Sequence, residues 1–273
     1  MIGRVPYWTV WVVGIVAVIW IIPIVGIVVT SFRPTAEIIL GWWRIAPLTL
    51  TLDAWIAVWN NYPLAPAFVT TAQLAIIATG ATMLLTPAAA YAFHFLKFRF
   101  RRVLLIIIIN AFVLPQQIVI IPLFQLWGSL GLIDNFAAVL IPYVGLSFAW
   151  SIFLVKNFLE DFPKELIEAA RIDGCGPVST FWHVVLPNTM TPIFAVGILQ
   201  FLWTWNALLL PMLYLRTAVP MPVLLARLSG QYELNLDQLS VAAIVTTAVP
   251  LVIFLIFQRY FALGSTTRSG AKD

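Results

Sequence analysis

Six long apolar runs divide this chain, and they restrict its possible folds more than any other feature. Each run is close to the ~20 residues that a helix needs to cross a bilayer. Lipid cannot hydrogen-bond an exposed backbone, so helices that satisfy their own amides are the favoured spanning structure. The sequence therefore predicts an all-α polytopic membrane protein, with residues 1–273 forming a single domain of six transmembrane helices. The predicted spans are 8–31, 68–95, 103–125, 136–155, 189–212 and 240–258.

The composition agrees with membrane insertion and excludes several functions. Hydrophobic residues make up 62% of the chain and charged residues only 10%, a balance foreign to soluble domains. The single cysteine, Cys175, excludes an internal disulfide and a multi-cysteine metal site. Two histidines are too few for a typical catalytic zinc site, and the sequence has no GxxxxGKS or GxxxxGKT phosphate loop. We therefore expect no enzyme activity, no metal site and no cofactor in this chain.

The basic residues between the spans indicate how the chain is oriented. With the N-terminus inside, eleven of them fall on the cytoplasmic side and four on the outer side. The four outer ones are Arg33, Arg44, Arg216 and Arg227. This bias predicts a multi-pass protein of the cell (inner) membrane with both termini in the cytoplasm. Its basic residues then report topology and lipid contact, not nucleic-acid binding.

Segment 156–187 is the one long polar interval between two spans, and its orientation makes it cytoplasmic. Pro163 suits a first helical turn, Gly174 can take the left-handed conformation that ends a helix, and Pro187 is expected to stop a second, shorter helix. Three residues of the first helix are spaced to form one apolar face, namely Leu166, Ile167 and Ala170. A solvated loop has no need of such a face, so we expect this segment to dock onto another structure.

Amide side chains inside the spans are the candidate lining of a solute pathway. The amides in the predicted spans include Gln73 and Gln125, and the five candidates for the pathway are Asn110, Gln116, Gln117, Gln200 and Asn206. Interhelical hydrogen bonds, worth about 1 kcal/mol each, account for any single one of them. Together they favour a neutral polyhydroxy solute over an ion, because no acidic or basic residue lies well inside a span. Prolines in or near the spans predict kinks or breaks, which suit a transporter that moves.

Two outer segments have alternative interpretations. Residues 32–67 are rich in tryptophan and proline, which favours an interfacial aromatic belt over a docking surface for an external protein. Residues 214–239 contain Gly230, Gln231 and Tyr232. This loop is either a plain surface loop or a contact for an external solute-binding protein, and the sequence favours neither.

The cytoplasmic segment carries a family resemblance. Glu168-Ala169-Ala170, then Asp173-Gly174 and finally Leu186-Pro187 resemble the EAA motif of ABC importer permeases, in the right order and between the right spans. Asp173-Gly174 and Trp205-Asn206 resemble the carbohydrate, maltose-type branch of that family. The resemblance covers the chain from about Thr30 to Arg259. Cys175 departs from the alanine that usually follows the glycine.

The resemblance implies the transmembrane domain of a type I ABC importer. In that family the EAA helix couples to a separate ATPase, which binds ATP and Mg. Glu168 would pair with a basic residue of that ATPase, and Ala169 and Ala170 would permit close approach. Gly174 would set the turn, and Leu186-Pro187 would fix the attachment to the fifth span. The implied partners are a second permease subunit, two ATPase subunits and an extracellular or periplasmic solute-binding protein.

Two alternatives to a carbohydrate permease remain open. An ABC permease for an amino acid, a peptide or a glycerol-phosphate would share the EAA loop but not Asp173 or Trp205-Asn206. A secondary carrier would require intramembrane acids or an inverted repeat, and the sequence shows neither. The individual solute has no signature in the chain.

Overall fold

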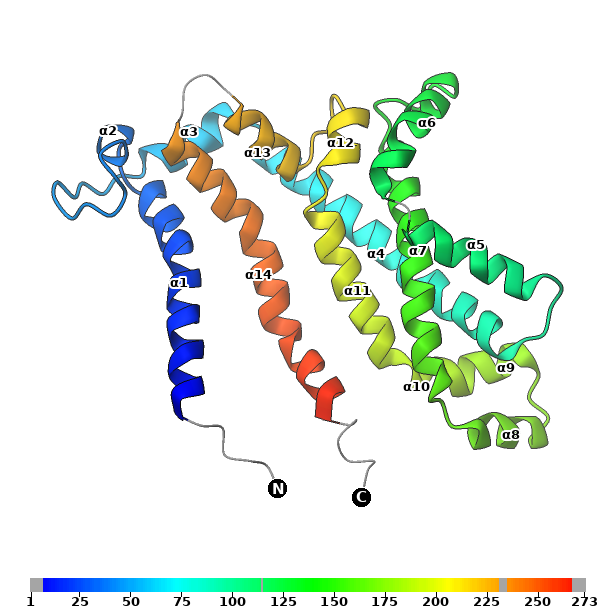
Figure 1. The fold of residues 1–273 in the computed structure, drawn as a ribbon. Coiled ribbons are helices and arrows are strands. Elements are labelled where there is room, and N and C mark those ends of the chain that lie inside the picture. The colour runs from blue at the N-terminus through cyan, green and yellow to red at the C-terminus, as the bar shows by residue number, and fades with distance from the viewer. Residues whose placement is uncertain (1–6, 114, 231–234, 267–273) are drawn as a thin grey trace. The chain divides into compact units, whose positions relative to one another are not determined.

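The computed structural model describes residues 7–113, 115–230 and 235–266, with the side chains of the last helix described as far as Phe257. All regular structure within these ranges is helical, as the apolar runs predicted (Figure 1). The chain divides into two compact units. The first takes in residues 1–65 and 224–249, and the second residues 66–223 and 250–273.

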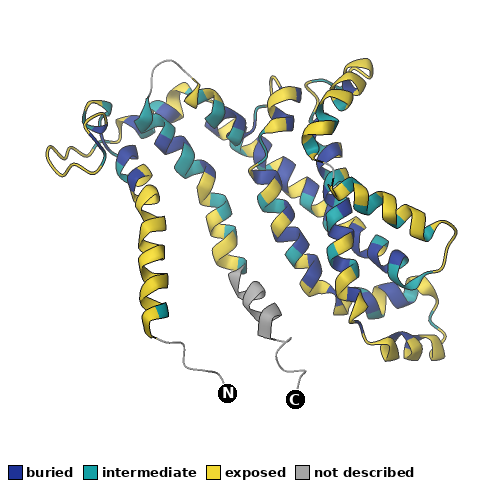
Figure 2. Ribbon diagram, viewed as in Figure 1, coloured by how far each residue is buried: buried dark blue, intermediate teal, exposed yellow. Residues whose placement is uncertain are grey.

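The first unit is built from helices at both ends of the chain. It contains α1 (Tyr7–Ser31), α2 (Thr35–Ile38), α3 (Asp53–Asn61), the start of α4 (Leu64–Phe95), most of α13 (Met221–Ser229) and the first part of α14 (Leu236–Thr266). Helix α1 is apolar and exposed along nearly all of its length (Figure 2). An apolar helix with no core of its own protein around it is what a lipid-facing span requires.

Arg33 organises the segment between α1 and α3. Its side chain is only 1% exposed and pairs with Glu37 Oε2 at 2.9 Å. The guanidinium also donates to the backbone carbonyls of Trp42, Arg44 and Pro47 at 3.1, 2.9 and 2.7 Å. Glu37 accepts a further hydrogen bond from the Thr49 amide. The side chain of Thr49, together with Arg33 and this amide, holds the pKa of Glu37 below its ordinary value. In the sequence, Arg33 served only as an indicator of membrane orientation. In the structure, its guanidinium also holds this loop in its fold through hydrogen bonds.

The second unit contains the remaining helices. They are α5 (Arg101–Val113), α6 (Gln116–Ser129), α7 (Phe136–Glu160), α8 (Lys164–Ile172), α9 (Pro177–Thr180), the π-helical turn η1 (Phe181–Val185), α10 (Leu186–Asn188), α11 (Met190–Trp205) and α12 (Leu209–Tyr214). Helix α7 is the centre of this unit, because α5, α11 and α12 all pack against it. Most of the buried positions of α7 and α11 appear as a dark blue stripe in Figure 2.

Helices α4 and α7 are joined by two buried hydroxyl pairs. Thr82 Oγ1 lies 2.8 Å from Ser147 Oγ, and Thr86 Oγ1 lies 2.8 Å from Ser151 Oγ. Both pairs step by four residues on each helix, so they lie on one face and fix the register over a full turn. All four side chains are buried, where a hydroxyl without a partner would be costly.

Among the described residues, four helices are long and apolar enough to cross a membrane, namely α1, α4, α7 and α14. Two bent pairs raise this number to six if each pair counts as one span: α5 with α6 at 101°, and Pro177–Asn188 with α11 at 72°. The predicted runs 103–125 and 189–212 are therefore not continuous helices. Pro115, which has no N–H to donate, stands at the α5–α6 break, whereas α11 ends at Trp205 before α12 begins. Other prolines, such as Pro87 and Pro142, lie inside unbroken helices.

Candidate functional site

The polar loop begins as the sequence predicted. Helix α8 starts directly after Pro163 and carries Glu165 in its first turn, where negative charge stabilises a helix N-terminus. Gly174 follows the helix with a φ of +78°, which confirms the left-handed turn. The amide of Cys175 donates to the Ala170 carbonyl at 2.9 Å and closes that turn. The glycine therefore fixes the point at which the chain reverses.

The apolar face of α8 is used by the chain itself. Ile167 and Ala170 are buried, whereas Leu166 is 41% exposed, so only two of the three residues predicted to form one apolar face are covered by the chain. We call the cluster beneath α8 the loop core; its members are Ala90, Tyr91, Val155, Leu159, Phe162, Ile167, Phe181, Val185 and Val196. Ala170, which was expected to face a partner, instead lies on the inner side of α8. This side docks the loop onto α4, α7 and α11 of the same chain.

The second half of the loop is tied to α4 by Tyr91. The Tyr91 hydroxyl donates to the Pro177 carbonyl at 2.9 Å. Its ring packs against Phe95 and Phe181, with centroids 5.5 and 5.4 Å away. Tyr91 thus holds the start of α9 and the π-helical turn to one span. Sequence reasoning missed this residue, because a tyrosine inside an apolar run carries no local sign of such a role.

The Leu186-Pro187 pair lies at the junction with α11. Leu186 packs against the loop core, and Pro187 is exposed within α10. The helix does not stop at Pro187 as predicted; it runs to Asn188, because proline is tolerated in a first helical turn. The 72° bend follows at this point and leads into α11.

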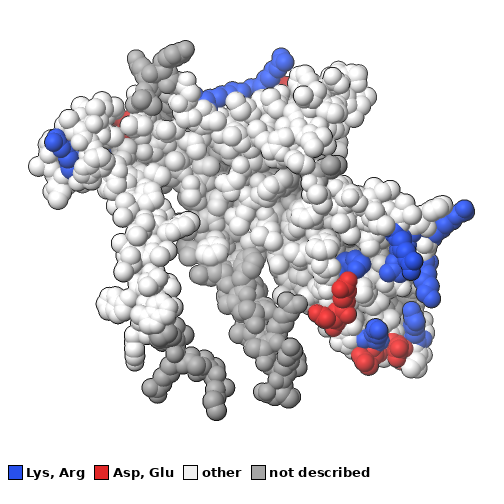
Figure 3. Space-filling model, viewed as in Figure 1, with Lys and Arg blue, Asp and Glu red and all other residues white. Residues whose placement is uncertain are grey.

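The outer side of the loop exposes both acidic and apolar side chains. We call this set the exposed loop surface: Glu168, Ala169, Ile172, Asp173, Val178 and Trp182. Ile172 is 87% exposed and Val178 71%, so large apolar side chains stand beside acidic ones on this surface. Glu168 forms no ion pair with any residue that the structure describes. Charged side chains gather over α8 and the start of α5 in Figure 3.

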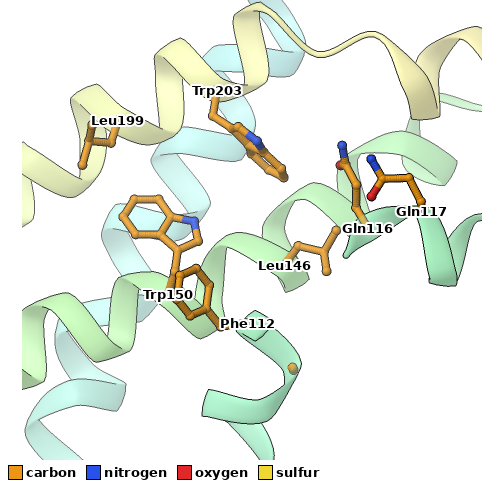
Figure 4. Close-up of a pocket in the computed structure, with 8 residues that line it drawn as sticks. Phe112, Gln116, Gln117, Leu146, Trp150, Leu199 and Trp203 are labelled. Atoms are coloured by element: carbon orange, nitrogen blue, oxygen red, sulfur yellow. The ribbon is translucent and has the colours of Figure 1, made fainter. Parts of the chain in front are cut away.

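A cavity of about 600 Å³ lies between α5, α6, α7 and α11. We call it the indole–amide cavity; it is lined by Ala111, Phe112, Gln116, Gln117, Leu146, Trp150, Leu199 and Trp203 (Figure 4). A neighbouring cavity of about 470 Å³ shares Gln116 and Trp203 with it and is also lined by Asn206. Three of the five predicted pathway amides, Gln116, Gln117 and Asn206, thus border one or both of these cavities.

The other two predicted amides lie elsewhere. Asn110 is exposed and donates to the Ile106 carbonyl of its own helix at 2.7 Å. Gln200 is fully buried and donates to Thr204 Oγ1 at 3.0 Å. Neither residue borders the two cavities. Sequence reasoning missed Trp150 and Trp203, because a tryptophan that lines a cavity cannot be distinguished in a sequence from one that faces lipid.

The predicted external contact is described only at its first residue. Gly230 follows α13 and donates its amide to the Ala226 carbonyl at 3.2 Å. Gln231 and Tyr232 lie outside the described residues.

The family follows from a comparison with known protein families. Residues 86–264, which hold the loop, both cavities and α11, match the family described as "binding-protein-dependent transport system inner membrane component". The chain belongs to this family. The resemblance drawn from the EAA motif is thereby confirmed, as is the all-α fold of a type I importer domain. This permease is an integral component of an inner membrane transport system that depends on a binding protein.

Relatives of the permease cover nearly its whole length. A probable ABC transporter permease of Pyrococcus horikoshii is 32% identical over 264 residues, which are 95% of each chain. An arabinooligosaccharides transport system permease of Halalkalibacterium halodurans is 31% identical, over 88% of this chain and 87% of the relative. A solved chain of a bacterial ABC transporter involved in alginate import superposes with a TM-score of 0.82 at 22% identity, over 93% of this chain and 95% of that one. This last likeness shows that the fold is shared.

Proposed function

We propose that this permease is one of two membrane subunits of an ATP-driven importer for a sugar or sugar-like solute. The observation that carries the proposal is the construction of the 156–187 loop. Its inner side shares one buried core with α4, α7 and α11, while its outer side presents Glu168, Ala169 and Ile172 to a partner. A partner that binds the outer side of such a loop can therefore move the spans together with it.

The partner on the cytoplasmic side is a separate ATPase subunit, because this chain has no phosphate loop of its own. Two such subunits bind ATP and Mg, and one takes the exposed loop surface into a groove. Glu168 pairs there with a basic residue, and Ala169 permits close approach. When the ATPase dimer closes on ATP, it displaces the loop, and the loop core passes this displacement to the spans as a rigid-body movement.

The carbohydrate class is supported by residues and by a relative. Asp173-Gly174 and Trp205-Asn206 resemble the carbohydrate branch, and the relative from Halalkalibacterium halodurans is named for arabinooligosaccharides. A second permease completes the pathway, since one chain supplies at most six spans. An external binding protein delivers the solute, and residues 214–239 are its proposed contact. Both termini of the permease face the cytoplasm, according to the distribution of its basic residues.

The proposal is tested by ATP-driven uptake in proteoliposomes that contain the whole complex. Replacing Glu168 with alanine should lower uptake about tenfold or more, because the basic partner is left unpaired in the interface. Gly174→Val should do the same by straining the turn at positive φ. Asp161→Ala is the matched control, because Asp161 is also exposed but lies before α8. Uptake that needs no ATP, or that survives both changes in an assembled complex, would refute the proposal.

A further inference from the structure

We propose that the indole–amide cavity binds a ring of an uncharged saccharide, so that this subunit itself contacts the solute during transport. The inference rests on the proposed import function and goes further. It names the residues that touch the solute and separates neutral saccharides from phosphorylated or acidic ones. Four observations on the cavity carry it.

The first observation is that two indoles line the cavity from different helices. Trp150 comes from α7 and Trp203 from α11 (Figure 4). The ring of Trp203 is held by Tyr143 in an edge-to-face contact, with centroids 5.1 Å apart and planes at 75°. Trp150 is partly buried and packs against the loop core. Both rings are thus held before a solute arrives, and the C–H face of a sugar ring packs well on the face of an indole.

The second observation is an unpaired amide across the cavity from the indoles. Gln116 and Gln117 stand on the first turn of α6, and Figure 4 shows their side chains to the right of the Trp203 ring. The Oε1 atom of Gln116 is buried and has no hydrogen-bond partner among the described residues. A buried acceptor without a partner is costly, and a solute hydroxyl can supply the missing donor. An amide also donates, so it can match a hydroxyl group in both directions.

The third observation is the absence of charge. None of the eight residues that line the cavity is ionisable. A phosphate or carboxylate group that entered here would lose its water without gaining a positive partner, which is strongly unfavourable. A neutral saccharide loses only hydroxyl–water hydrogen bonds, and the two glutamines replace part of these.

The fourth observation is the position of the cavity at a sharp bend between two apolar helices. Helices α5 and α6 meet at 101°, and Phe112 and Gln116 flank the break. Irregular backbone inside a bilayer is tolerated where it lines a cavity or is covered by protein, and broken helices are frequent sites of substrate binding in transporters. The volume of about 600 Å³ lies within the range of sites for small molecules.

The experiment measures ATP-driven uptake by the reconstituted complex, together with its ATPase activity. The probes are radiolabelled maltose, trehalose and glucosylglycerol as neutral solutes and sn-glycerol 3-phosphate as a charged one. The test variants are Trp150→Leu, Trp203→Leu and Gln116→Leu. Trp150→Phe and Trp203→Phe keep an aromatic face and check that a loss is not merely a folding defect. Trp20→Leu and Gln125→Leu are matched controls, because both residues are exposed and border neither cavity.

We expect the native complex to import at least one neutral solute. Each test variant should lower its uptake about tenfold, while the ATPase activity stimulated by the loaded binding protein stays within about twofold. The phenylalanine variants and the two controls should retain uptake. Unchanged uptake in all three test variants, or import of the charged probe alone, would overturn the inference and leave the import function standing. Uptake of the solute by a native complex without any need for ATP would overturn both.

Discussion

At the scale of single residues, Asp134 shows how an exposed carboxylate can hold two distant segments together. It follows α6 in a left-handed conformation, with φ of +63°. Its carboxylate accepts hydrogen bonds from the Arg216 and Thr217 amides at 2.7 and 2.9 Å and from the Thr217 hydroxyl at 2.5 Å. These bonds, above all the one from the Thr217 hydroxyl, lower the pKa of Asp134 to about 2. The ionised form is therefore the one that the folded protein stabilises.

This gives a prediction about pH. Because the pKa is depressed in the folded state, the contribution of Asp134 is complete above its ordinary pKa near 4 and is lost as pH falls toward 2. Asp134→Asn, which tolerates the same backbone conformation, should lower the thermal unfolding midpoint at pH 7. The difference between native and variant protein should shrink between about pH 4 and pH 2. Melting curves in detergent at a fixed scan rate measure it, with Asp161→Asn as control. A difference that is constant with pH would contradict the assignment.

At the scale of elements, the α4–α7 pair depends on its hydroxyl contacts, and this dependence is measurable. Thr82→Val and Ser147→Ala should each destabilise the protein by roughly 1 kcal/mol, with a coupling energy of about 0.6 kcal/mol in the double-mutant cycle. Unfolding in mixed detergent micelles gives these free energies. Thr79→Val in the same helix should be neutral or stabilising, because the Thr79 hydroxyl is buried and has no hydrogen-bond partner in the described part of the chain. Strict additivity of the Thr82 and Ser147 changes would show that the pair does not interact.

The same scale shows what the sequence could predict and what it could not. Apolar run length predicted the unbroken helices α1, α4, α7 and α14 but not the breaks in the other two runs. The preference of glycine for positive φ predicted the turn at Gly174, since this preference is a local property. Spacing alone placed Leu166 with Ile167 and Ala170, but the position of the loop core decides which of them is buried. For the same reason, Gln116 and Gln200 look alike as polar residues in apolar runs. Only the packing of the helices decides that Gln116 lines a cavity and that Gln200 is buried.

At the scale of the whole molecule, the orientation in the membrane is a prediction from the distribution of charge, and it has its own test. Cys175, the single cysteine of the chain, lies in the loop that is predicted to be cytoplasmic. A membrane-impermeant maleimide should therefore leave Cys175 unlabelled in intact cells and label it in inverted vesicles. For comparison, Ile45→Cys in a Cys175→Ser background should be labelled only from outside, since Ile45 is 84% exposed in a segment predicted to be external. Addition of the ATPase subunits should then slow the labelling of Cys175, because the loop that carries it would be covered. Labelling of Cys175 from outside would contradict the predicted orientation. It would also place the loop on the side of the membrane where the proposed ATPase could not bind it.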